Sequence, residues 1–520
     1  MSLFSAQLYP GRALGFLVLG ASLHDILTRI KAEPQQFPKI DFMSGTDPLR
    51  KIVIGLPRNG LQLHFDGPEQ RLRLIEVRDF TKNHIFLKPA NDKERDLVRP
   101  PSTQGVTAQQ PDAAAGPTFR HIYQRFLGPT YDGDYEPNQG SRDGLGTYAL
   151  SYPGVSFAFP MKESDYSPSK DVVSLIPSTA IPVTMAVFSG DSWAQARDQL
   201  WTEVLPSVKT FAPLSKGKDS CPDEVSLVKI HGGGKLQLFR KWTNSCFWIH
   251  LGETTPQDLV TELGAPDSKH RNSDQRMYIH KLRTASNTNA PPNDNDLRND
   301  LTDTDQSSSP ASDGYYSNDE AIEEDSVANV SNEHWWNYFH LGFDVLVSTP
   351  TNPSQPPPSR PLNHGLPEKH IKSFRADRLV VTKVILHGNV PRSYPFNRHR
   401  RCRWEIPYLS YKNPNMTINS ETHFRDVETS LLEEWKSIYA SEEDARQKQR
   451  GMVLNRGWGN SPGSSCELLG GWEENGAAAT RPGAGKKFEG NEESTTTLYA
   501  FPGLIFEVLK NGFVSAVQVF

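Results

Sequence analysis

The sequence lacks the features that mark disulfide-bonded or zinc-binding proteins. Its 520 residues contain four cysteines, Cys221, Cys246, Cys402 and Cys466, and no two of them have C-x-x-C spacing. Cysteines so far apart favour reduced thiols in a cytosolic protein over a disulfide framework or a structural zinc site.

Long apolar runs are also missing. A transmembrane helix needs about 20 apolar residues, and the run ALGFLVLGASL (residues 13–23) is much shorter. Its short apolar core and small residues resemble a signal peptide. We favour the alternative, a buried strand over LGFLVLG followed by a helix with Ser22 as its N-cap. Any membrane contact is therefore expected to be peripheral.

No catalytic motif is present. The sequence has no H-E-x-x-H or G-x-G-x-x-G, the patterns that place zinc ligands or phosphates. Its G-x-S-x-G match, GNSPG (residues 459–463), lies in the Gly/Glu-rich tract at 441–494, so no nucleophile elbow is predicted there. GAGKK (residues 483–487) lacks the first glycine and the Ser or Thr of a phosphate loop. The net charge of −5 argues against nucleic acid as a partner. We expect no enzyme activity, no cofactor and no metal site.

Four segments share one pattern, a glycine followed by apolar residues one, three and five positions later. They are NGLQLHF, PGVSFAF, LGFDVLV and PGLIFEV, and their glycines are Gly60, Gly154, Gly342 and Gly503. A period of two is typical of a strand with one buried face. Each segment has a plausible return strand and a preceding amphipathic helix. One helix on one hairpin buries too little surface to be stable, so the units must share sheets.

The predicted fold is α+β, with repeated helix-plus-antiparallel-meander units forming shared sheets, helices on one face, and long disordered insertions. Polar, Pro-rich and Gly-rich compositions cannot offset the entropy of ordering. The predicted boundaries are a first unit at 1–88, a disordered linker at 89–117, a second unit at 118–190, a connecting β-rich segment at 191–250, a third unit at 251–440 with disordered insertions at 284–332 and 350–373, a Gly/Glu-rich disordered insertion at 441–494, and a closing hairpin at 495–520 belonging to a fourth unit with its helix near 424–438.

One segment is unusually cationic. NRHRRCRWEIP (residues 397–407) contains the candidate phosphate- or lipid-binding residues Arg398, His399, Arg400, Arg401 and Arg403. Guanidinium groups suit the phosphates of a phosphoinositide or phosphopeptide. The alternatives are a solvated edge strand protected by its charges and ion pairs to the chain's own carboxylates.

Two aromatic segments, residues 243–252 and 333–342, are predicted to be core strands because large rings stand beside aliphatic residues. The alternative for Trp335 or Trp336 is an exposed interface anchor.

Several blocks together resemble the phagosome assembly factor family. They are LGASLHDILTRI, KIVIGLPRNGLQLHFDGPEQRLRLIEVRDFTK, TTPQDLVTELGAP, NYFHLGFDVLV, VTKVILHGNVP, FNRHRRCRWEIP and GLIFEVLKNGFVSAV. They occur in the family's order and cover the segments expected to be ordered. The insertions have no counterpart in the resemblance.

The resemblance implies a non-enzymatic cytosolic adaptor of autophagy at the forming phagophore membrane. The implied partners are a β-propeller protein (breast carcinoma amplified sequence 3 type) and a phosphoinositide-bearing membrane. The alternatives are trafficking between the trans-Golgi network and the plasma membrane, direct lipid binding, and a hydrolase whose site is assembled across units. The family supplies no catalytic or binding residues that can be transferred to this sequence.

Overall fold

The structure is a computed structural model of the chain. It describes all residues except 1–2, 44–46, 48, 90–92, 99–115, 131–132, 138–143, 212–222, 244, 272–332, 350–377, 392, 394–395, 411–416 and 456–494. The described part is α+β, with helices and four mostly antiparallel sheets, as predicted. None of the described helices is long and apolar enough to span a bilayer.

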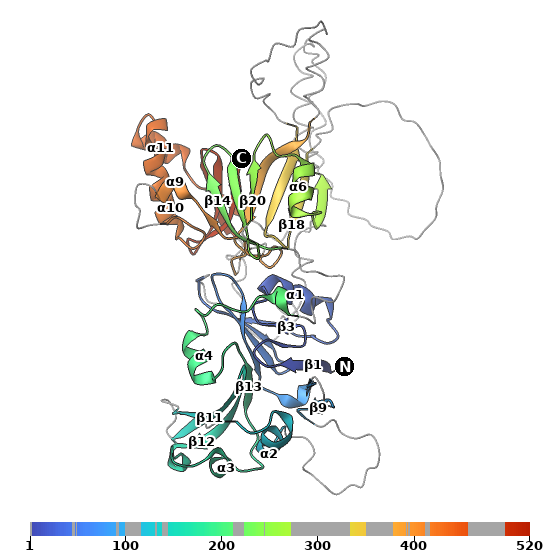
Figure 1. Cartoon of the computed structure of the whole chain (residues 1–520). Coiled ribbons are helices and arrows are strands. Elements are labelled where there is room, and N and C mark those ends of the chain that lie inside the picture. Colours follow the sequence, from blue (N-terminus) through green and yellow to red (C-terminus); the bar gives the residue numbers. More distant parts are fainter. Residues whose placement is uncertain are drawn as a thin grey trace, which may run out of the picture.

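The first half contains two sheets, drawn in the lower part of Figure 1. A five-stranded sheet has the order β3-β2-β1-β8-β9, and an eight-stranded sheet has the order β10-β11-β12-β13-β7-β6-β5-β4. The strands are β1 (Phe4–Tyr9), β2 (Ala13–Leu14), β3 (Leu17–Val18), β4 (Asp41–Met43), β5 (Ile52–Leu56), β6 (Leu61–Phe65), β7 (Leu72–Val77), β8 (Asn83–Leu87), β9 (Arg95–Asp96), β10 (Asp134–Glu136), β11 (Leu145–Tyr152), β12 (Val155–Lys162) and β13 (Thr184–Val187). The helices are α1 (Leu23–Ala32), α2 (Phe119–His121), which continues as the π-helix η2 (Ile122–Phe126), α3 (Val172–Leu175) and α4 (Trp193–Gln199).

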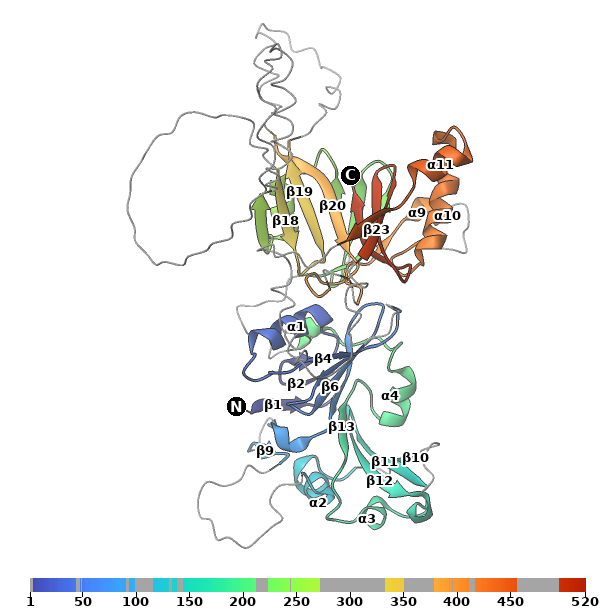
Figure 2. The same ribbon diagram turned by 180° about the vertical axis from the view of Figure 1, so that it is seen from behind.

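The second half also contains two sheets, drawn in the upper part of Figures 1 and 2. A four-stranded sheet has the order β16-β15-β14-β21, and an eight-stranded sheet has the order β17-β18-β19-β20-β25-β24-β23-β22. The strands are β14 (Val225–His231), β15 (Lys235–Arg240), β16 (Cys246–His250), β17 (Ser268–Arg271), β18 (His334–Tyr338), β19 (Phe343–Ser348), β20 (Val380–His387), β21 (Trp404–Glu405), β22 (Met452–Asn455), β23 (Thr495–Phe501), β24 (Leu504–Leu509) and β25 (Val514–Val519). The helices are α6 (Pro256–Leu263), α9 (Pro407–Ser410), α10 (Phe424–Glu434) and α11 (Glu442–Lys448).

The two halves share much of their strand pairing, although β9 has no counterpart in the second half. In each eight-stranded sheet two four-stranded meanders join through their last strands, β13 with β7 and β25 with β20. In each half the strand after the first meander pairs in parallel with the strand that opens the half, β8 with β1 and β21 with β14. Each meander follows at least one helix, as the sequence pattern predicts.

The four glycines lie at corresponding turns, between the second and third strand of each meander. All have positive φ, which glycine adopts at little cost. Each glycine carbonyl also accepts a backbone hydrogen bond from the end of the fourth strand of its meander. The donors are the N–H groups of Arg78 to Gly60 (2.7 Å), Phe188 to Gly154 (3.1 Å), His387 to Gly342 (3.0 Å) and Phe520 to Gly503 (3.1 Å).

Each half has its own hydrophobic core between the sheets and the helices. In the first half, α4 covers the other face of the eight-stranded sheet. Ala196, Leu200 and Trp193 pack there against Leu74 and Phe188. The prediction that helices lie on one face only is therefore wrong for α4, because this sheet carries apolar side chains on both faces.

Two local predictions are also corrected. Residues 441–455, assigned to a disordered insertion, form α11 and β22; a serine N-cap at Ser441 starts the helix. LGFLVLG is two short strands instead of one, because Gly15 (φ 60°) turns the chain between β2 and β3. Most of linker 89–117 and most of the three insertions lie outside the described residues.

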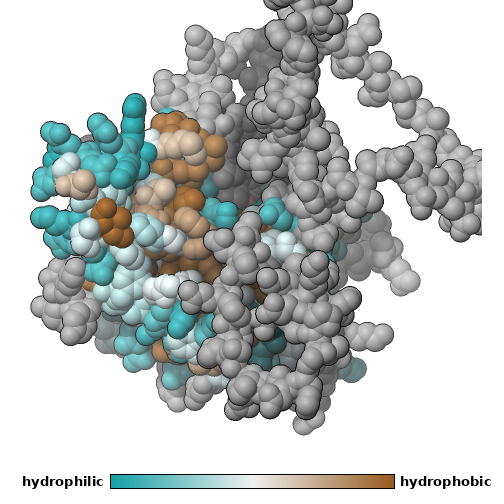
Figure 3. Space-filling model, turned by 90° about the horizontal axis from the view of Figure 1, so that it is seen from above, coloured by the Kyte–Doolittle hydropathy of each residue, from teal (hydrophilic) through white to brown (hydrophobic). Residues whose placement is uncertain are grey.

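The surface of the second half includes apolar regions. Seen from above, apolar side chains gather next to a hydrophilic area (Figure 3). Met452 and Val453 on the edge strand β22 are exposed, and Phe520 is about half exposed. Such surface suits contact with another macromolecule.

Candidate functional site

The arginine-rich segment lies where the two halves meet. His399, Arg400 and Arg401 are buried, and Arg400 and Arg401 are only 8% and 6% exposed. Arg398 and Arg403 are partly exposed. The predicted patch is therefore not an open cationic surface.

A buried charge network surrounds Arg400. Glu224 accepts from Arg71 at 2.6 Å through one carboxylate oxygen and lies 3.1 Å from Arg400 Nη1 through the other. Arg400 also pairs with Asp25, on α1 of the first half. Partial loss of hydration raises the pKa of Asp25, whose side chain is still 44% exposed, but Arg400 and His24 outweigh this effect and hold the pKa well below its usual range. These ion pairs connect the two halves.

Arg403 and Arg401 have different environments. Arg403 pairs with Glu421 at 2.8 Å and lies 3.6 Å from Glu69 of the first half. The Nε and Nη1 of Arg401 have no hydrogen-bond acceptor among the described residues. Burial lowers the pKa of Arg401 to about 10, with Glu421 opposing that shift.

Two uncharged residues also form hydrogen bonds across the contact between the two halves, which we call the junction. Gln70 Nε2 donates to the Asn389 carbonyl at 2.8 Å, and Asn389 Nδ2 donates to Gln70 Oε1 at 2.7 Å. Both groups are buried, where unmet hydrogen bonds are costly. The junction therefore favours one relative placement of the halves.

Arg400 and Arg403 form ion pairs with the chain's own carboxylates, which is one of the two alternatives stated in the sequence analysis. Phosphate binding stays a prediction, and of the five residues Arg398 and Arg403 are the two with partial exposure. Sequence reasoning missed the partners Asp25, Glu69 and Glu224. Asp25 and Arg400 are 375 positions apart, and no local pattern links them.

A second buried cluster stands beside this segment. His387 Nε2 and His399 Nε2 each lie within 2.9 Å of a different oxygen of Asp344. The two imidazole rings stack with their centroids 3.7 Å apart. Burial and then His387 lower the pKa of His399 to about 3, although Asp344 opposes them. The cluster joins the segment at 397–403 to strands β19 and β20.

These three side chains could in principle hold a metal ion, since their ligand atoms lie within 4.8 Å of one another. Both Nε2 atoms, however, face the carboxylate as N–H donors. Metal-bound imidazoles usually donate their other N–H to an acceptor, and the Nδ1 atoms of His387 and His399 have no partner in the described structure. The arrangement fits a hydrogen-bonded tether better than a metal centre.

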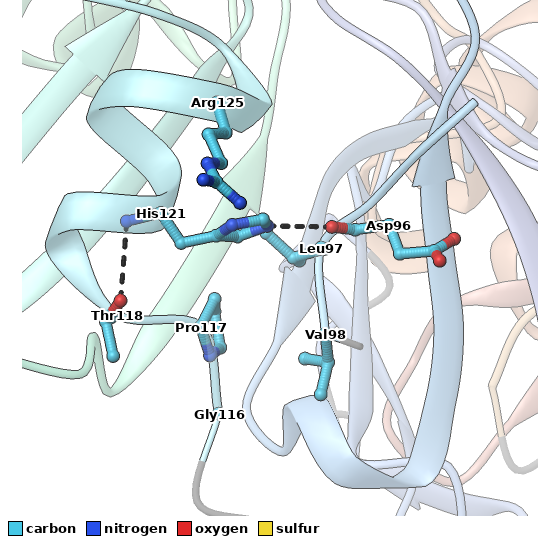
Figure 4. Close-up of a pocket in the computed structure, with 8 residues that line it drawn as sticks. All are labelled: Asp96, Leu97, Val98, Gly116, Pro117, Thr118, His121 and Arg125. Carbon is cyan, nitrogen blue, oxygen red and sulfur yellow. Dashed lines mark hydrogen bonds between the residues drawn. The ribbon is translucent and has the colours of Figure 1, made fainter. Parts of the chain in front are cut away.

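A pocket of about 330 Å³ lies between the β9 segment and α2 (Figure 4). His121 Nε2 donates to the Asp96 carbonyl at 2.8 Å, and Arg125 points toward His121. The pocket is lined by Asp96, Leu97, Val98, Gly116, Pro117, Thr118, His121 and Arg125. It offers cationic and polar groups to a small ligand.

Beside this pocket a Ser–His–Asp chain crosses β1, β8 and β9. Ser5 Oγ lies 2.9 Å from His84 Nδ1, and His84 Nε2 lies 2.9 Å from Asp96 Oδ1. A hydrolase also needs oxyanion donors and a substrate pocket at the nucleophile. Ser5 is exposed on a strand, and none of the pockets found in the described regions is lined by it. Ser5 and His84 are direct cross-strand neighbours, which accounts for their contact.

The two aromatic segments have different outcomes. Trp336 is buried in the second core, so the core prediction is confirmed for it. Segment 243–252 forms β16, an edge strand whose Trp248 is 38% exposed, so the core prediction is wrong for this ring. Aromatic content alone does not distinguish an edge strand from a central one.

Comparison with known proteins gives consistent matches. The family profile described as Phagosome assembly factor 1 matches residues 13–297 and 373–520. A PHAF1 protein of Arabidopsis thaliana is 22% identical over 520 residues, covering 99% of this chain and 92% of the relative. A PHAF1 protein of Drosophila melanogaster is 23% identical over 499 residues, covering 92% and 84%. No solved structure matches.

Proposed function

Since the chain belongs to the phagosome assembly factor 1 family, we propose that it acts in phagosome assembly as a non-enzymatic cytosolic adaptor. In this proposal it works at the forming phagophore membrane, in complex with a β-propeller partner. The observation that carries the proposal is the family match, which extends over both halves of the chain.

The surface chemistry supports an adaptor. The two eight-stranded sheets end in the edge strands β10, β4, β17 and β22. Edge strands and exposed apolar side chains are common docking elements. A protein with several such elements can hold two partners together.

Affinity capture of the tagged full chain, followed by mass spectrometry, tests the adaptor role. We expect a β-propeller protein in the eluate and starvation-induced puncta that contain the tagged chain. Recovery of no β-propeller protein would reject the partner. Steady accumulation at the trans-Golgi network, unchanged by starvation, would favour the trafficking alternative.

Direct phosphoinositide binding is a second candidate, favoured by the partial exposure of Arg398 and Arg403. Flotation with phosphatidylcholine vesicles, with and without phosphoinositide, measures it. We expect the double variant Arg398→Gln/Arg403→Gln to lose phosphoinositide-dependent flotation. The matched control is Arg58→Gln/Arg450→Gln, which removes the same charge from exposed positions elsewhere. Equal flotation of both double variants would remove this patch as the lipid site.

We also propose that the helix-and-meander units are internal copies. The corresponding glycine turns and the shared strand order of the two halves support this proposal. Superposition of residues 1–200 on the described residues of 225–520 tests it, and unrelated backbone traces would reject it.

A further inference from the structure

Polar contacts link the two walls of the pocket between the β9 segment and α2 (Figure 4). His121 Nε2 donates to the Asp96 carbonyl at 2.8 Å. Arg95 Nη1 donates to the carbonyls of Arg125 and Phe126 at 3.2 and 3.5 Å. The volume of about 330 Å³ lies at the lower end of the range of about 300–1,000 Å³ that is usual for small-molecule sites. The pocket therefore suits a small ligand and is largely preformed.

Arg125 is the only lysine or arginine among the residues that line this pocket. It is exposed, and its guanidinium forms no hydrogen bond or ion pair within the described part of the chain. Arg120 on the same helical segment differs, since its Nε donates to Gln124 Oε1 at 3.2 Å. A ligand from solution can therefore reach the guanidinium of Arg125 without displacing another residue.

An unusual helical turn carries Arg125. The segment Ile122–Phe126 is a π-helix, in which the Leu127 N–H donates to the Ile122 carbonyl at 3.1 Å. Turns of this kind are rare and occur frequently at functional sites. The hydrogen bond from Arg95 to the Arg125 carbonyl holds the backbone of this turn, while the Arg125 side chain points toward His121 in the pocket (Figure 4).

The one carboxylate among the lining residues does not neutralise Arg125. Figure 4 shows the Asp96 carboxylate pointing away from the pocket, and it lies 2.9 Å from His84 Nε2 on β8. A single unpaired cation matches a ligand with one negative charge. A guanidinium can bind a carboxylate through two parallel N–H···O hydrogen bonds. A phosphate monoester carries a charge of about −1.5 to −2 near pH 7 and suits a site with more cations.

We propose that the β9–α2 pocket binds a small organic carboxylate. The carboxylate pairs with the Arg125 guanidinium, and the carbon body of the ligand lies against Leu97, Val98 and Pro117, which also line the pocket. This inference does not depend on the adaptor proposal, because its test uses the purified chain and small molecules.

Calorimetric titration of the full-length protein with benzoate, phenylacetate and hexanoate, each compared with its amide, tests this proposal. The amide keeps the shape of the acid and removes its charge. We expect at least one acid to bind at one site per chain, about tenfold or more tighter than its amide, because a charged partner strengthens the hydrogen bonds of a guanidinium. If none of the three acids binds better than its amide, the proposal is wrong.

Three variants locate the site. Arg125→Gln should weaken binding of the preferred acid by about tenfold. Arg120→Gln is the matched control, since it removes the same charge from an exposed position of the same helical segment that does not line the pocket, and it should leave binding unchanged. Val98→Trp keeps the charge but fills the pocket, and should also weaken binding by about tenfold. Urea unfolding of each variant checks that the fold is retained.

Three further results would overturn the proposal. Equal losses for Arg125→Gln and Arg120→Gln would mean that the acids respond only to the general charge of this surface. Tighter binding of phenyl phosphate than of benzoate, lost in Arg125→Gln, would make the pocket a phosphate site. Tighter binding of a peptide through its free C-terminal carboxylate than of any of the three acids would make a partner chain the occupant.

Discussion

Glu224 is the central test of how the two halves are held together. Its carboxylate contacts Arg71 and Arg400 at 2.6 and 3.1 Å, and all three side chains are at most 10% exposed. The substitution Glu224→Gln keeps the shape and one acceptor but removes the charge. Two buried guanidinium groups then lose the carboxylate they share.

The expected loss follows from this geometry. Removing one partner of a buried ion pair costs about 3–5 kcal/mol. Arg400 keeps Asp25, and Arg71 keeps Glu69 at 3.7 Å. We therefore expect the lower end, about 3 kcal/mol of the free energy of unfolding.

Urea unfolding followed by tryptophan fluorescence measures this loss. The matched control is Glu136→Gln, which breaks the exposed pair with Arg197 and should cost less than about 1 kcal/mol. If Glu224→Gln costs no more than Glu136→Gln, the junction is not held by this network and the reasoning fails.

Three further predictions use the same measurement. Arg401→Met should be neutral or stabilising, since its buried Nε and Nη1 lack acceptors, whereas Arg400→Met should cost about 3 kcal/mol; the reverse order would contradict this. In the unfolded state His399 has its usual pKa of 6.5, whereas in the folded state its pKa is lowered to about 3. Stability should therefore fall as the pH drops, by about 2 kcal/mol between about pH 6.5 and pH 4.5, and His399→Gln should flatten this dependence; an unchanged slope would refute it. Gly154→Ala should cost more than about 3 kcal/mol, because a Cβ there overlaps the Gly11 backbone. Gly144→Ala, which also has positive φ but open space around it, should cost about 1 kcal/mol, and equal losses would contradict the steric argument.

The sequence predicts the local elements of this fold well. The four glycine-headed strands, their return strands and the preceding helices all form, because alternation and capping residues act over short distances. Ser22 caps α1 as its position in the sequence suggests, and Thr255 caps α6 in the structure.

The sheet order and the junction could not be predicted in the same way. The pairing of β13 with β7 and of β25 with β20 depends on which apolar faces meet in three dimensions. The arginines at 398–403 looked like a surface patch because their carboxylate partners lie in distant segments. Trp248 was placed in the core because composition does not reveal which strand ends a sheet.

The parallel pairing of each opening strand has a consequence for how the protein is made. Strand β1 pairs with β8, so Asn83, the partner of Phe4, is synthesised soon after Phe4. Strand β14 must wait for β21, since Val228 pairs with Trp404 beyond two long insertions. On the ribosome the first half can therefore close while the second is still incomplete, and the hairpin of β14 and β15 emerges with an unsatisfied edge.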